Sequence, residues 1–121
     1  MSHKTTDKHF AIFKKEVDRW VPKLGVSDWR IEFDHNDDED SSRAWYSILI
    51  DDKVAELFLT VGWEDKITEK RIRRSGFHEV MHVRLARIEE MLMARGYKEE
   101  EVSQALHEII YVFENLFYGS D

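Results

Sequence analysis

Apolar residues recur at three- and four-residue steps over a long stretch in the second half of the chain: Phe77, Met81, Leu85, Ile88 and Leu92. This spacing is typical of the buried face of a helix, because one helical turn takes 3.6 residues. Thr68 is a residue type that caps helix N-termini, and Gly96 is one that follows helix C-termini. The sequence therefore predicts a long helix from about residue 68 to about residue 95.

Two further helices are expected. Residues 7–23 carry apolar side chains at helical spacing, and Pro22 and Gly25 mark the end of that segment. Residues 98–117 show the same periodicity. Because only a short link around Gly96 separates this last helix from the long one, we expect the two to form an antiparallel helical hairpin.

Three strands are expected between the first and the second helix. Residues 29–34 alternate apolar and polar side chains, and residues 44–50 and 54–61 form two apolar runs joined by a short polar turn. The expected fold is α+β in the order α-β-β-β-α-α, with a three-stranded, mostly antiparallel sheet. Residues 1–121 are expected to form one domain, with residues 1–8 disordered.

Composition narrows the classes of function. The chain has no cysteine, so any metal must be held by histidines and carboxylates. The net charge of −7 argues against a general nucleic-acid binder, and the basic run at residues 70–74 is interpreted as a solvated helix face. No signal peptide or membrane span is recognisable, so we expect a cytoplasmic protein. The oligomeric state stays open.

The sequence HEVMH at residues 78–82 carries the candidate chemistry. His78 and His82 are four residues apart, so on a helix they point only about 40° from each other and both rings can reach one ion. They fall just outside the apolar stripe, where they can face a cleft. Glu79 lies about 100° round from His78, beside the metal, which suits a general base acting on a zinc-bound water.

A catalytic zinc site usually has three protein ligands, and the last predicted helix offers three candidates for the third. Glu108 is favoured, because it borders the apolar arc of that helix and lies within about one helical turn of the level of His82. Glu114 and His107 remain as alternatives. The metal set predicted from the sequence is therefore His78, His82 and Glu108.

Taken together, HEVMH on a long helix, the strands before it and a glutamate on the helix after it resemble the gluzincin branch of the zincins. The likeness is greatest to the minimal metallopeptidases encoded by bacteriophages, with which the segments LGVSDWRIEF, AWYSILIDD and VAELFLTV agree in character. It extends over most of the chain from Leu24 to Phe117. Only the HExxH part is specific.

The resemblance implies a zincin-like fold and a zinc-dependent peptidase acting on a peptide or protein, in the host cytoplasm if the chain is phage-encoded. It implies that His78 and His82 are ligands, that Glu79 is the base and that a downstream glutamate completes the site. It also implies that a strand beside the helix, best matched by residues 54–61, holds an extended substrate. A hydrogen-bond donor for the developing oxyanion is expected among four residues: Tyr46, Tyr97, His107 and Tyr111. The alternative is a catalytically inactive module of the same fold that docks a protein partner.

Overall fold

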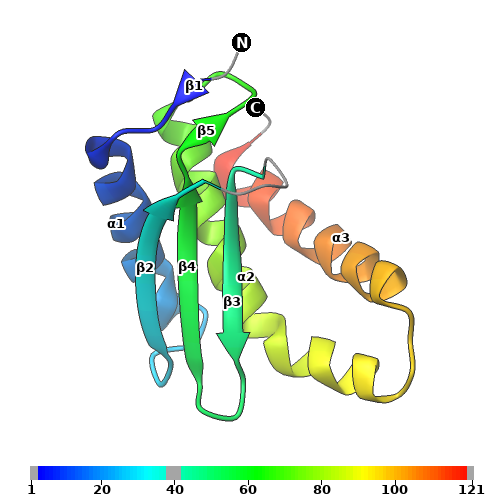
Figure 1. The fold of residues 1–121 in the computed structure, drawn as a ribbon. Coiled ribbons are helices and arrows are strands. Elements are labelled where there is room, and N and C mark those ends of the chain that lie inside the picture. Colours follow the sequence, from blue (N-terminus) through cyan, green and yellow to red (C-terminus); the bar gives the residue numbers. More distant parts are fainter. Residues whose placement is uncertain (1–2, 38–41, 120–121) are drawn as a thin grey trace.

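Residues 3–37 and 42–119 are described by the computed structural model, which Figure 1 shows as a ribbon. In these residues three helices accompany five strands, and the α+β class and the predicted order of the longer elements are confirmed. The helices are α1 (Asp7–Lys23), α2 (Glu69–Ala94) and α3 (Glu99–Tyr118). The strands are β1 (His3–Lys4), β2 (Arg30–Asn36), β3 (Ala44–Leu49), β4 (Val54–Thr60) and β5 (Gly62–Trp63).

The main sheet has the strand order β2-β4-β3, with β4 in the middle. The predicted hairpin of β3 and β4 is antiparallel, as expected, but β2 pairs with β4 in parallel. The expectation of a mostly antiparallel sheet is therefore wrong. The physical reason lies in β4, where the consecutive residues Leu57, Phe58 and Leu59 are all buried. A strand with both faces buried is suited to the centre of a sheet, and β4 takes one neighbour on each edge.

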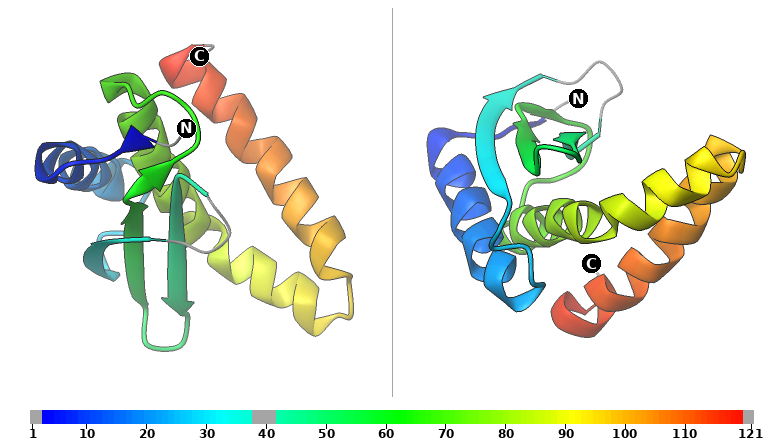
Figure 2. Two further views of the ribbon diagram at one scale, coloured as in Figure 1. Left: turned by 45° about the horizontal axis from the view of Figure 1, so that its top comes forward. Right: turned by 90° about the horizontal axis from the view of Figure 1, so that it is seen from below.

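Helix α2 runs behind the sheet, and α1 lies along one side of it (Figures 1 and 2). Phe77 and Val80 of α2 are fully buried in the core that these elements share. Gly76 allows α1 to approach closely, because a Cβ atom there would lie 3.2 Å from the carbonyl oxygen of Phe13. The two helices therefore form a rigid base for the residues that follow in α2.

Helices α2 and α3 form the predicted helical hairpin. Thr68 caps α2, its side chain accepting a hydrogen bond from the backbone N–H of Arg71, and Gly96 lies just past the C-terminal end with φ of +86°. The last turns of α2 and the first turns of α3 extend beyond the sheet (Figure 1). As a result α3 stands opposite β3, with α2 between them.

The N-terminal segment differs from the expectation of disorder over residues 1–8. Residues 3–8 are ordered, because β1 pairs with β5 and Thr6 caps α1 in a reciprocal arrangement with His9. Residues 1–2 lie outside the described part of the chain. Among the described residues, none of the helices has the length and apolar character needed to cross a membrane.

Candidate metal centre

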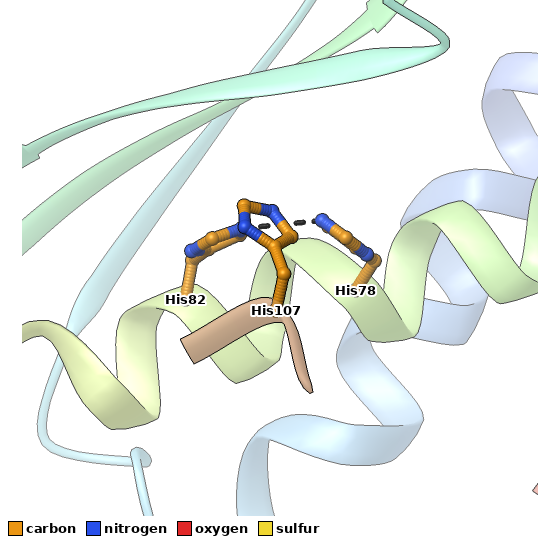
Figure 3. A group of neighbouring side chains, drawn as sticks. All are labelled: His78, His82 and His107. Atoms are coloured by element: carbon orange, nitrogen blue, oxygen red, sulfur yellow. Dashed lines mark hydrogen bonds between the residues drawn. The ribbon is translucent and has the colours of Figure 1, made fainter. Parts of the chain in front are cut away.

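Three histidines meet between α2 and α3. His78 and His82 project from α2 and His107 from α3 toward one point (Figure 3). One ring nitrogen from each lies within 4.8 Å of the other two, and the Nε2 atoms of His78 and His82 are 3.1 Å apart. Two nitrogens bound to one tetrahedral zinc ion at 2.0–2.1 Å would be about 3.3 Å apart. The three histidines are therefore close enough to hold a metal ion.

The rings of His78 and His107 are oriented by hydrogen bonds that involve their Nδ1 atoms. His78 Nδ1 lies 2.6 Å from Oε2 of Glu114, and His107 Nδ1 lies 2.8 Å from the carbonyl oxygen of Ser103. Both partners only accept, so Nδ1 donates in each case. Ligating histidines in metal sites are commonly held in this way by carboxylates and carbonyls. Although burial opposes it, the hydrogen bond to Glu114 and the charge of Glu79 raise the pKa of His78, so this ring has to release the proton of its Nε2 to bind a metal.

Glu114 is itself fixed by Arg74. The Nε atom of Arg74 donates to Oε1 of Glu114 over 2.6 Å, while its other nitrogens donate to the carbonyl of Gly119 and to the side chain of Asn115. Arg74 comes from α2 and Glu114 from α3, so this ion pair ties the two helices together beside the histidines. It fixes the carboxylate that in turn orients His78.

His82 is the most enclosed of the three rings. Its side chain is buried, and its Nδ1 atom has no hydrogen-bond partner among the described residues. Burial lowers the pKa of His82 to about 3, with further lowering from His78 and His107. Tyr46 of β3 stacks on the ring at a centroid distance of 4.3 Å. His82 therefore stays neutral near pH 7, which is the form of histidine that binds metals.

Glu79 lies beside the cluster and is only 3% exposed. Its Oε1 atom has no partner among the described residues. Burial raises the pKa of Glu79 to about 7, an effect that charge on His78 opposes and the nearby Glu114 reinforces. A carboxylate with this pKa can exchange a proton near neutral pH.

The histidines and Glu79 line a cleft of about 480 Å³ between β3, α2 and α3. This volume lies in the range typical of small-ligand sites. Of the four residues considered as oxyanion donors, Tyr46, Tyr111 and His107 line this cleft, His107 as a member of the histidine cluster. Tyr97 lies at the turn after α2. The cleft thus combines three histidines that are close enough to hold a metal ion, a buried carboxylate and two phenols.

The strand beside the cleft is β3, not β4. Residues 54–61 were the candidate for holding an extended substrate, but β4 is paired on both edges and cannot accept another strand. Strand β3 pairs only with β4 in the part of the chain that the structure describes, and its outer side faces α2 and the cleft. Among the described residues, β3 and not β4 is therefore the strand that borders the cleft and has an edge without a neighbouring strand.

The structure brings together three of the four predicted site residues. His78, Glu79 and His82 lie at the cleft, but Glu108 is exposed on the other side of α3 and His107 takes its place near the two α2 histidines. His107 therefore replaces Glu108 as the candidate third ligand. Glu114, the other alternative for the third ligand, is hydrogen-bonded to the Nδ1 atom of His78.

A signal in the sequence could have found this pair. His107 and Glu114 are seven residues apart, so they lie only about 20° from each other on a helix. Two residues of ligand type thus share one side of α3, which Glu108 does not. No short motif marks Arg74, whose role depends on the distant Glu114.

Comparison of the chain with models of known protein families, with curated proteins and with solved structures finds no significant match.

Proposed function

We propose that the chain is a zinc-dependent peptidase in which His78, His82 and His107 hold the metal and Glu79 is the general base. The observation that carries the proposal is the meeting of three histidine nitrogens with a buried, unpartnered carboxylate in one cleft. Histidine nitrogens suit zinc, and three protein ligands with an open fourth position are typical of catalytic rather than structural zinc sites.

The residues around the site suit hydrolysis. Zinc, when bound, supplies Lewis acidity and activates water near neutral pH. Glu79, with its pKa raised to about 7, accepts the proton that attack on a carbonyl releases and can pass it to the leaving amine. The pKa of Tyr46 is raised to about 12, mainly by burial, so its phenol stays protonated and can donate to the developing oxyanion.

Among the described residues no strand pairs with the outer edge of β3, and this supports a peptide as the substrate. Unpaired backbone groups on an edge strand can pair with an extended segment of another chain, which places successive peptide bonds along the strand. Because β3 borders the cleft through Ala44, Trp45 and Tyr46, a segment paired in this way passes the three histidines. Side chains of the substrate would then alternate between the cleft and solvent.

The test combines metal analysis with hydrolysis. Protein loaded with zinc and dialysed should retain about one zinc per chain and cleave members of a quenched-fluorescence peptide library. Glu79→Gln should retain the metal and lose cleavage. Glu108→Gln, which alters an exposed glutamate on α3, should retain both the metal and cleavage. Failure of the wild-type protein to retain zinc would refute the proposal.

Retention of zinc without cleavage of any peptide would favour the other function considered, a binding module that docks a protein partner. In that case a partner recovered by pull-down should bind Glu79→Gln as well as it binds the wild-type protein. Such a result would keep the metal centre and remove the peptidase activity from the proposal.

A further inference from the structure

Helix α3 has one broad apolar arc, and only part of it is buried. Val102, Leu106 and Ile110 are buried in the core that α3 shares with α2. A second set remains exposed: Ile109 (43%), Val112 (65%), Phe113 (39%) and Leu116 (69%), here called the outer stripe. Val112, Phe113 and Leu116 follow Ile109 by three, four and seven residues, which is the spacing of a helix face that is normally covered. A helix whose apolar arc is only partly covered normally packs against a further surface.

The outer stripe lies away from the metal centre. Val112 is five residues after His107, so the two side chains point about 140° apart on the helix. No other helix or strand of the described chain lies over the outer side of α3 (Figures 1 and 2). A partner on the outer stripe would therefore leave the cleft accessible.

The exposed area suits an interface between two copies. From the exposed fractions, the outer stripe and the adjoining Phe117 present roughly 500 Å² of apolar surface, near the upper end for the largest patch on a monomer. Pairing of the same patch across a twofold axis buries this area twice, about 1,000 Å² in total, which reaches the lower limit for a specific interface.

The charges around α3 also favour a second copy. The helix has no lysine or arginine, and its first turn carries Glu99–Glu101, so it suits neither nucleic acid nor an anionic membrane surface. A second copy offers an apolar surface of the same kind, and an antiparallel arrangement places the two acidic first turns at opposite ends of the pair.

We propose that two copies of the chain pair through the outer stripes of their α3 helices, antiparallel about a twofold axis beside Val112. The apolar arc of each α3 is then covered by its own α2 and by the partner's α3. Since α3 supplies His107 and Glu114, the pairing holds in place the helix that completes the metal centre. This interface is independent of whether the site hydrolyses peptides.

The mass in solution tests the pairing. Sedimentation equilibrium over a concentration series should give twice the chain mass of 14.5 kDa for the wild-type protein and the single-chain mass for Val112→Glu/Leu116→Glu. Leu49→Glu on β3 is the matched control, because Leu49 is also 60% exposed and apolar but lies outside the outer stripe, and it should keep the double mass. Circular dichroism verifies that each variant is folded.

Two outcomes overturn the proposal. One is a wild-type protein with the single-chain mass at every concentration, and the other is a folded Val112→Glu/Leu116→Glu variant that keeps the double mass. The absence of cysteine allows a second test of the arrangement. Under mild oxidation Val112→Cys should cross-link with itself, and Ile109→Cys should cross-link with Leu116→Cys. Self-cross-linking of Ile109→Cys would contradict the antiparallel arrangement.

Discussion

Replacement of Glu114 by glutamine tests whether the carboxylate behind His78 tunes the metal site. Its two oxygens each make a 2.6 Å contact, one with His78 Nδ1 and one with Arg74 Nε, and the side chain is almost fully buried. Glutamine keeps the shape but removes the charge. Loss of such a partner typically weakens metal binding about 10- to 100-fold, so we expect a loss of this size for zinc.

The same change should also lower the free energy of unfolding of the metal-free protein. The guanidinium of Arg74 is largely buried, and without Glu114 it loses its anionic partner while keeping its bonds to Gly119 and Asn115. Removal of one member of a buried ion pair costs about 3 kcal/mol. Urea unfolding with the metal chelated measures this part separately from zinc affinity.

Competition with a chromogenic chelator measures zinc affinity, and two controls separate the possible causes of a change. Glu108→Gln alters an exposed glutamate of the same helix and should bind zinc as the wild-type protein does. Arg74→Gln breaks the ion pair from the other side but leaves the carboxylate on His78, so it should lose stability and retain most of the zinc affinity. A folded Glu114→Gln variant with wild-type zinc affinity would refute the reasoning.

Three further predictions follow from the site and the core. In equilibrium dialysis, His107→Ala should bind zinc about 100-fold more weakly or worse, whereas Glu108→Ala should bind zinc normally. The magnitude follows because a four-ligand site binds zinc with roughly 10–16 kcal/mol, or about 3 kcal/mol per ligand. Because burial raises the pKa of Glu79 from 4.5 to about 7, the folded metal-free protein keeps a proton between these pH values that the unfolded chain has released. Its free energy of unfolding should therefore fall as the pH rises through this window, by about 3 kcal/mol relative to Glu79→Gln. If the free energies of unfolding of the two proteins, measured in urea, changed in parallel with pH, this prediction would be contradicted. Phe77→Ala should lower the free energy of unfolding by about 3–5 kcal/mol in urea titrations. The reason is that Phe77 is fully buried and its ring centroid lies 4.8 Å from that of Trp20. A loss below about 1 kcal/mol would contradict this packing.

The elements with a local cause could be predicted from the sequence. The cap at Thr68, the glycine end at Gly96 and the β3–β4 hairpin each depend on residues close together in the chain, and the structure confirms all three. The parallel pairing of β2 with β4 and the two-residue strands β1 and β5 depend instead on distant contacts. A strand of two residues has no periodicity, so nothing in the sequence marks it.

The sequence favours Glu108 as third ligand, whereas the structure places His107 beside the two α2 histidines. The reason for this difference lies in the geometry of α3. A helical wheel averages over the length of the helix and assigns the whole apolar arc to the core, which leaves Glu108 at its border. The buried residues Val102, Leu106, Ile110 and Glu114 instead follow steps of four, so the line of contact turns by about 40° at each step. By its last turn the packed side of α3 has moved to Glu114, next to the direction of His107. The same rotation leaves the rest of the apolar arc facing outward, so the residues that misled the choice of ligand are those proposed to bind a second copy.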